Sequence, residues 1–187
     1  IRRLFMDTDL DGVVAAVTKL SLVDGKAGRL IVWGHDIEAL ASDYDFADMA
    51  ALLWYGVAPD RQDGAAIRQS LGQGRLRVAE MLPVLLPAGR GLSPIEGLRA
   101  GLAMFNDNTC DHILLCAAVP VFSAALWRQG QDQEPVAPDP GKGQAEDFLA
   151  MLTGGVVDRA ACWAPRCFPA RHCWLWVIWT RVMTIPA

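Results

Sequence analysis

The chain has 187 residues and a mass of 20.3 kDa, enough for one domain with a hydrophobic core but too little for two full domains. Hydrophobic residues make up 52% and charged residues 20%, which excludes disorder as a description of the whole chain. The net charge of −4 and the pI near 5.3 argue against the basic surface of a nucleic-acid-binding protein, so no nucleic-acid partner is expected.

The longest apolar run without a charge covers residues 113–127, and its 15 residues would rise only about 22 Å as a helix. Because the hydrocarbon core of a bilayer is about 30 Å thick, no membrane association is predicted. Asp7, Asp9 and Asp11 follow two arginines at the N-terminus and leave no apolar core for a signal peptide. Five cysteines, an odd number, favour reduced thiols and a cytoplasmic location.

The charge distribution divides the chain near Asp158. Residues 1–158 carry 13 basic and 21 acidic side chains, whereas residues 159–187 carry four arginines and no acid. The second segment also contains four of the seven tryptophans and three of the five cysteines. Because GC-rich coding DNA read out of frame yields such a composition, we interpret residues 159–187 as an atypical tail, either frameshifted or disordered.

The predicted elements begin with a hairpin. Two apolar runs, residues 20–23 and 30–33, flank a turn that contains two glycines and predict a small β-hairpin. A short helix follows, from His35 or Asp36 to Ala41. The next helix is indicated by apolar residues that recur at intervals of three and four, and Gly56 ends it. Its predicted buried face comprises Phe46, Met49, Leu52 and Leu53.

Residues 61–86 predict two shorter helices with a hinge at residues 72–74, where glycine occurs twice. Their predicted buried positions are Leu76, Met81, Leu82 and Leu85. Ser93-Pro94-Ile95-Glu96 combines an N-cap serine, a proline at the first helical position and a capping-box glutamate, and so predicts a helix start. The buried side of this helix is predicted to comprise Ile95, Leu98, Leu102 and Phe105.

Asn108 or Thr109 can cap the following helix, whose residues 113–126 are apolar on nearly all sides and indicate a central buried helix. Residues 131–142 predict a polar loop, and residues 144–153 an amphipathic helix that the glycines at 154 and 155 end. Several helices with a single hairpin define an all-α protein with a small N-terminal β element.

Two segments resemble ligand loops in part. Residues 7–12, Asp-Thr-Asp-Leu-Asp-Gly, match the first half of a calcium loop, but Thr18 stands where the bidentate carboxylate is needed. An acidic cluster at a helix start is therefore the favoured interpretation. Residues 141–143, Gly-Lys-Gly, resemble a phosphate loop, yet Val136 and Gly143 replace the required glycine and hydroxyl residue. A flexible linker is the favoured reading there.

Cysteines and histidines offer two candidate metal groups. Cys110, His112 and Cys116 diverge around a helix, which favours buried thiols over a shared ion. In the tail, adjacent histidine and cysteine do not fit the paired spacing of zinc ligands. The tail group comprises Cys162, Cys167, His172 and Cys173. His35 has acidic neighbours and could titrate near neutrality, but a loop position between the hairpin and the next helix is the favoured interpretation. No metal site is predicted, and no pattern identifies a catalytic or cofactor-binding residue.

The hairpin region resembles the N-terminal signature of the citrate synthase family in residues 11–16, 22–30 and 34–41. Trp33 departs from that pattern, because many members have arginine before the glycine. Residues 51–56 with Pro59 are similar to the LLxxGxLP stretch of the family.

Residues 145–154 are similar to the AxxFLxMLxG helix of the family. The blocks follow in the family's order and cover residues 11 to about 158. Residues 1–158 are thereby identified as the N-terminal part of the large domain.

The resemblance implies an all-helical homodimer that condenses acetyl-CoA with oxaloacetate and water, giving citrate and CoA in the tricarboxylic acid cycle. In that mechanism an aspartate removes a methyl proton, two histidines stabilise the enol and polarise the keto carbonyl, and arginines hold the carboxylates. The reaction uses acid–base groups in a closed site, with acetyl-CoA as a substrate and without a cofactor or metal.

None of those catalytic residues is carried over to this chain. The family's first active-site histidine block would follow Gly154, where the atypical tail stands, and His172 lacks the Asn-Ala-Ser context of that block. The chain is therefore expected to be truncated and inactive alone. Two alternatives stay open: a 2-methylcitrate synthase that uses propionyl-CoA, and a non-catalytic helical fragment that associates through exposed apolar surface.

Overall fold

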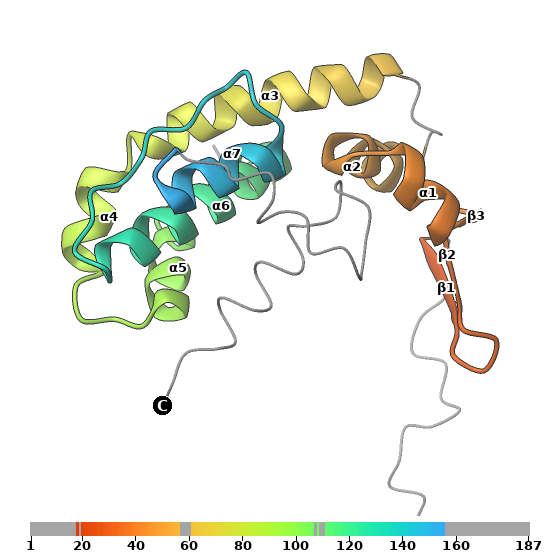
Figure 1. Ribbon diagram of the computed structural model, residues 1–187, viewed down its shortest axis with the longest axis horizontal. Helices are drawn as coiled ribbons and strands as arrows, with labels where there is room; N and C mark the ends of the chain where they lie inside the picture. The colour runs from red at the N-terminus through yellow and green to blue at the C-terminus, as the bar shows by residue number, and fades with distance from the viewer. Residues whose placement is uncertain (1–17, 19, 57–60, 107, 109–110, 156–187) are drawn as a thin grey trace, which may run out of the picture. The chain divides into compact units, whose positions relative to one another are not determined.

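The computed structural model describes residues 18, 20–56, 61–106, 108 and 111–155 (Figure 1). These residues belong to two compact units that divide between Ile37 and Glu38. In the described part of the chain, seven helices accompany one three-stranded sheet, so the predicted all-α class with a small β element is confirmed.

The first unit contains the antiparallel sheet, whose strands are β1 (Ser21–Asp24), β2 (Arg29–Val32) and β3 (His35–Asp36). β1 and β2 pair with Ser21 opposite Val32, which confirms the predicted hairpin. The turn between them is closed by the Asp24 carboxylate, which accepts the backbone N–H groups of Lys26 and Ala27 at 3.1 and 3.0 Å.

The third strand was not expected from the sequence. Trp33 and Gly34 have φ values of 49° and 81°, and positive φ at both positions is what a two-residue type I′ hairpin turn requires. Glycine adopts this conformation freely, whereas a bulky residue such as Trp33 rarely does, so no turn pattern is visible there. His35 consequently lies in β3, paired with Val32, and neither in a loop nor in the following helix.

The second unit is helical, and four of its helices pack around α6. The helices are α1 (Ile37–Asp43), α2 (Phe46–Tyr55), α3 (Arg61–Ala79), α4 (Leu82–Ala88), α5 (Pro94–Leu102), α6 (His112–Gln129) and α7 (Gln144–Thr153) (Figure 1). α3, α4, α5 and α7 all contact α6, and Ala117, Val121 and Phe122 of α6 lie fully buried in the main hydrophobic cluster. A smaller cluster joins α2 to α3. The prediction of a central buried helix is confirmed.

α6 is longer than the apolar run that predicted it, with 18 residues. In the described part of the chain it is the one helix whose length and composition would allow it to cross a membrane. This is weak evidence for a membrane span, because the core helix of a globular domain meets the same criterion, and four helices cover α6 here. Its N-cap is Asp111, two or three residues beyond the predicted caps, and the Asp111 carboxylate accepts the Leu114 N–H at 2.7 Å.

The predicted hinge at residues 72–74 is wrong. α3 is one continuous helix, and its glycines are points of close contact. A Cβ atom on Gly72 would lie 2.5 Å from the Pro140 carbonyl oxygen, and one on Gly74 would lie 3.0 Å from the Ala117 Cβ. The glycines therefore allow neighbouring backbone to approach α3 and do not bend it. Leu76, predicted to be buried, is 37% exposed, whereas Leu82 and Leu85 are buried as predicted.

The buried faces of α5 and α2 consist largely of small residues, whereas the sequence pattern predicted large apolar side chains there. Ile95 of α5 is 60% exposed. The glycines at 97 and 101 face α6 instead, where a Cβ atom would lie 2.9 Å from Leu126 Cδ2 and 2.7 Å from Phe122 Cδ2, respectively. In α2, Leu53 is 42% exposed, and three alanines with Leu52 make the buried face. These predicted faces are only partly correct.

Helix ends that depend on local capping are confirmed. The Ser93 backbone N–H and hydroxyl donate to Glu96 Oε2 at 2.9 and 2.7 Å at the start of α5. Gly56 and Gly154 have φ values of 68° and 85° and end α2 and α7 in the left-handed conformation. Residues 131–143 form the predicted connection between α6 and α7.

Candidate functional site

The most deeply buried polar group of the described residues is the guanidinium of Arg75, on the face of α3 that meets α7. Its side chain is 0% exposed, and that of its partner Asp147 is 1% exposed. Arg75 Nε donates to Asp147 Oδ2 at 2.6 Å, and Arg75 Nη1 donates to Gln144 Oε1. Arg75 Nη2 donates to the carbonyls of Lys142 and Asp139 at 2.8 and 3.3 Å. All three guanidinium nitrogens are thus hydrogen-bonded.

The same network holds the loop before α7. The second oxygen of Asp147 accepts the Asp139 N–H at 2.9 Å, and the Gln144 side chain donates to the Cys116 carbonyl on α6 at 2.7 Å. A buried charge is tolerated only when it is paired and hydrogen-bonded, and these contacts meet that condition. Since each guanidinium nitrogen is hydrogen-bonded within the fold and the side chain is fully buried, the cluster around Arg75 joins α3, α6 and α7 and is not accessible to a ligand.

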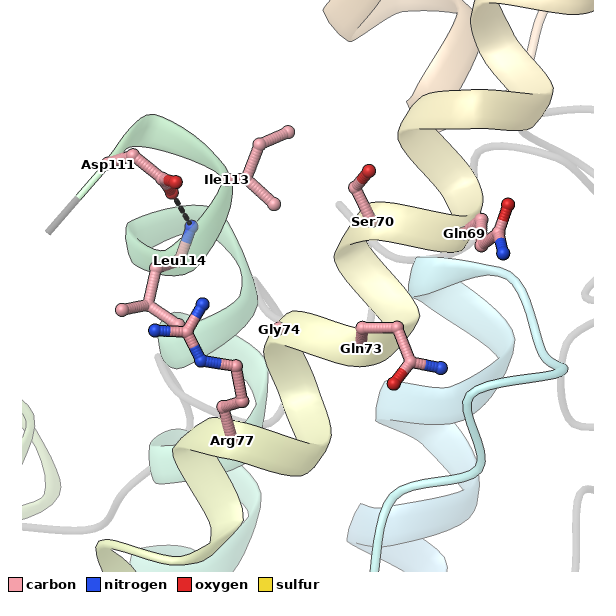
Figure 2. A pocket seen from close by; sticks show the side chains of 8 residues that line it. All are labelled: Gln69, Ser70, Gln73, Gly74, Arg77, Asp111, Ile113 and Leu114. Atoms are coloured by element: carbon pink, nitrogen blue, oxygen red, sulfur yellow. Dashed lines mark hydrogen bonds between the residues drawn. The ribbon is translucent and has the colours of Figure 1, made fainter. Parts of the chain in front are cut away.

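A groove of about 370 Å³ lies on the other side of α3, beside the start of α6 (Figure 2). Its lining comprises Gln69, Ser70, Gln73, Gly74, Arg77, Asp111, Ile113 and Leu114. Figure 2 shows Arg77 extending toward Leu114, with Gln69 and Gln73 on the opposite edge of α3. Gly74 lies at the crossing with α6, so the two helices are close there and the groove opens beside the crossing.

The groove can offer one guanidinium, one hydroxyl and two amides to a small polar molecule. Arg77, Ser70, Gln69 and Gln73 are all exposed, so their polar groups are hydrated and available. The Asp111 carboxylate adds one negative charge where it caps α6. Hydrogen-bonding groups of this kind orient a ligand, but the lining contains no pair of groups set up for proton transfer.

The predicted cysteine and histidine group is not brought together as a metal site. His112 packs edge-on against Trp54, with ring centroids 4.5 Å apart, and against Tyr55 at 6.5 Å. Cys116 is half-buried, and burial raises the pKa of its thiol. Cys110 lies outside the described residues. Within the described ranges, no three His, Cys, Asp or Glu side chains gather in a way that could hold a metal ion.

The remaining candidate residues are distributed as follows. Lys142 pairs with Asp139 at 3.5 Å and its carbonyl accepts from Arg75, while Gly141 N–H donates to Asp139 Oδ1 at 2.9 Å. The Gly-Lys-Gly segment is therefore part of a connection fixed to α3 and not a loop whose amides face outward. Residues 7–12 and the tail group, Cys162, Cys167, His172 and Cys173, lie outside the described residues.

Two aspartates and an arginine form a further charged cluster at the start of α2. Asp45 accepts the Asp48 N–H at 3.1 Å and pairs with Arg68 of α3. Burial raises the pKa of Asp45, but the Asp48 N–H and the Arg68 guanidinium outweigh it and leave the pKa below its ordinary value. For Asp48, burial and the neighbouring Asp45 charge raise the pKa. The cluster caps α2 and ties it to α3.

Sequence reasoning missed both Arg75 and Arg77. A signal was available for the first: Leu71, Arg75 and Val78 follow the helical spacing of a buried face. An arginine on such a face requires a buried acid elsewhere. No comparable signal marks Arg77, because exposed arginines are common on helices.

The comparisons with known proteins agree with this helical fold. The family profile described as citrate synthase, C-terminal domain, matches residues 9–167. The citrate synthase of Haloferax volcanii is 34% identical over 166 residues, which cover 78% of this chain and 42% of that protein. The citrate/2-methylcitrate synthase of Bacillus subtilis is 27% identical over 163 residues, with the same two coverages, 78% and 42%.

Solved structures agree as well. The crystal structure of citrate synthase from Thermotoga maritima superposes with a TM-score of 0.72 at 26% identity, covering 81% of this chain and 42% of that one. The citrate synthase of Thermoplasma acidophilum, solved in a ternary complex with carboxymethyl coenzyme A and oxaloacetate, shares the fold with a TM-score of 0.65 at 20% identity. The chain belongs to the citrate synthase family, whose members are condensing enzymes. It spans 42% of the length of the first two of these relatives.

Proposed function

We propose that this chain contributes to the condensation of an acyl-CoA with oxaloacetate. In that reaction the acyl α-carbon loses a proton and forms a bond to the keto carbon, whose oxygen takes up a proton, and water then cleaves the thioester and releases CoA. The observation that supports the proposal is the family match over residues 9–167 together with 34% identity to a citrate synthase. Acetyl-CoA, giving citrate, is the proposed substrate, without a cofactor. Propionyl-CoA, giving 2-methylcitrate, is the alternative, because relatives of both kinds match the chain.

The described residues support a scaffolding part in that reaction. Arg75, the most buried charged side chain of the described residues, is paired with Asp147 inside the fold. The lining of the groove beside α3 contains no pair of acid–base groups. We therefore propose that the proton-transferring groups lie outside the described residues and that the 187-residue chain alone does not turn over.

The direct test exchanges the matched segment in a working enzyme. Residues 9–155 of this chain replace the corresponding segment of the Haloferax volcanii citrate synthase, and CoA release is followed with a thiol reagent. Turnover with oxaloacetate supports the proposal, and the ratio of rates with acetyl-CoA and propionyl-CoA identifies the substrate. A folded chimera without CoA release from either acyl-CoA would refute it. The 187-residue chain, assayed in parallel, is expected to release no CoA.

A second candidate function is association with another subunit, in which this chain is a helical module. Four large apolar side chains on or next to α4 and α5 are exposed by 37% to 63%: Val84, Leu92, Ile95 and Met104. Contiguous exposed apolar surface is typical of interaction sites, and α4 and α5 are neighbouring helices that contact each other. We propose a second copy of the chain as the partner, as in a homodimer.

Sedimentation velocity at several concentrations tests this association. A reversible dimer that the double substitution Val84→Glu and Ile95→Glu converts to a monomer supports it. The matched control is Leu115→Glu, an exposed apolar residue of α6 that should leave the dimer intact. A monomer at all concentrations would contradict the proposal.

A further inference from the structure

Arg77 differs from the other two described arginine side chains of α3 in having no partner. Arg68 pairs with Asp45, and Arg75 pairs with Asp147. Within the part of the chain that the structure describes, Arg77 makes no ion pair and no hydrogen bond. Its guanidinium nevertheless lines the groove beside the start of α6. The donors of Arg77 are therefore free to bind an external acceptor.

The groove contains a further polar group besides Arg77. Figure 2 shows the Arg77 head group extending toward Leu114, while Gln73 extends from the opposite edge of α3. Ser70, one turn before Gly74, also lines the groove. The absence of a side chain at Gly74 leaves room between these groups. A volume of 370 Å³ lies within the range of small-molecule sites.

We propose that this groove binds a small organic anion, with its carboxylate or phosphate on Arg77 and a remaining polar group on Ser70. A planar guanidinium suits both oxyanions because its parallel N–H groups contact two oxygens at once. The Asp111 carboxylate on the opposite wall disfavours a ligand with several negative charges. The chemistry therefore favours an anion of low charge that also carries hydroxyl or carbonyl groups.

Binding is tested on the 187-residue chain by calorimetry at constant ionic strength, with lactate as the carboxylate probe and glycerol 3-phosphate as the phosphate probe. Saturable binding of either probe is expected, and the tighter one identifies the preferred anion. Arg77→Met should weaken that binding at least about tenfold, since a hydrogen bond to a charged group is lost. Arg77→Lys keeps the positive charge but loses the two parallel N–H groups that contact both oxygens, so it should give an intermediate affinity.

Arg90 provides the matched control, because it is an exposed arginine outside the groove. Arg90→Met should leave binding unchanged, and circular dichroism of each variant checks that the helices are intact. The proposal is overturned if neither probe saturates below about 10 mM, or if the Arg77 and Arg90 variants lose affinity equally. The readout is binding, so it does not depend on whether the family reaction is assigned correctly.

Discussion

Arg75 and Arg77 stand two residues apart on α3 and have opposite environments. Two residues correspond to about 200° of rotation on a helix, so the side chains leave from opposite sides. Arg75 is completely buried, with hydrogen bonds from every guanidinium nitrogen. Arg77 is exposed in the groove without a described partner. The same residue type therefore joins secondary-structure elements on one side and faces solvent on the other.

The difference between Arg75 and Arg77 is whether the guanidinium N–H groups are hydrogen-bonded within the protein, and this decides whether the side chain stabilises the fold or can bind a ligand. A buried guanidinium whose nitrogens are all hydrogen-bonded to protein acceptors stabilises the fold, and its removal leaves those acceptors unpaired. A guanidinium with free donors contributes little to stability and can bind an anion. The first two predictions test the buried side of α3, and the third tests the exposed side.

The largest effect is expected for Arg75→Met. Removing one partner of a buried ion pair leaves Asp147 charged without its cation, which costs about 3–5 kcal/mol of unfolding free energy. Urea denaturation followed by circular dichroism measures the loss. In the double variant Arg75→Met and Asp147→Leu, no buried charge of the pair is left, so part of the stability should return. A single variant as stable as the parent chain would show that the network does not hold the loop.

A smaller effect is expected where glycine allows close packing on α3. Gly72→Ala would direct a methyl group into the Pro140 carbonyl, a backbone atom that cannot rotate away. The expected loss is about 1–3 kcal/mol, more than the gain of about 1 kcal/mol in helix propensity. Thermal denaturation measures it.

Gly74→Ala is the matched control, because its new methyl group would meet only the Ala117 side chain at 3.0 Å. It should destabilise the fold less than Gly72→Ala. If these residues formed a hinge, both substitutions would stabilise the chain by favouring helix, and that result would contradict the packing role.

Arg77→Met is expected to change the free energy of unfolding by less than about 0.5 kcal/mol, as is usual for an exposed side chain without partners. The measurement is the same urea titration as for Arg75→Met. A loss comparable to that of the Arg75 variant would mean that Arg77 holds the fold together, and the contrast between the two residues would fail.

Helix existence and capping could be predicted from the sequence because they depend on neighbouring residues. Ser93 with Glu96 defined the start of α5, and residues 144–153 were assigned with the bounds that α7 has. Buried faces were predicted less well. Gly97 and Gly101 pack against α6 because they are small, and a rule based on apolar side chains ignores them.

Buried polar contacts were the most difficult to predict from the sequence, because the two residues that form them are distant in the chain. Arg75 and Asp147 are separated by 72 residues, and no local pattern joins them. The turn at Trp33 was missed for a different reason, since a tryptophan holds a conformation typical of glycine or asparagine. Long-range pairing and unusual backbone conformations are thus where sequence reasoning failed.

The smallest effect concerns the two aspartates at the start of α2. Because burial and the Asp45 charge raise the pKa of Asp48 in the folded state, that carboxyl binds its proton more tightly when folded. The stability that Asp48 contributes is therefore lost as the pH rises through its raised pKa. Asp45 has a lowered pKa, so the stability that it contributes is present at pH values above its ordinary pKa. Asp48→Asn removes the like charge and keeps an oxygen to accept the Asp45 N–H. It should raise the free energy of unfolding at pH 7 by at most about 0.5 kcal/mol.

The pH dependence distinguishes this electrostatic cause from a change in packing. Near pH 3, below the ordinary value of 3.8, Asp48 is protonated in both folded and unfolded chains, so Asp48→Asn should have no effect on unfolding free energy there. Asp45→Asn should act with the opposite sign at pH 7, because it breaks the pair with Arg68. A stabilisation by Asp48→Asn that persists unchanged at pH 3 would exclude charge repulsion as its source and indicate that the amide caps α2 better than the carboxylate.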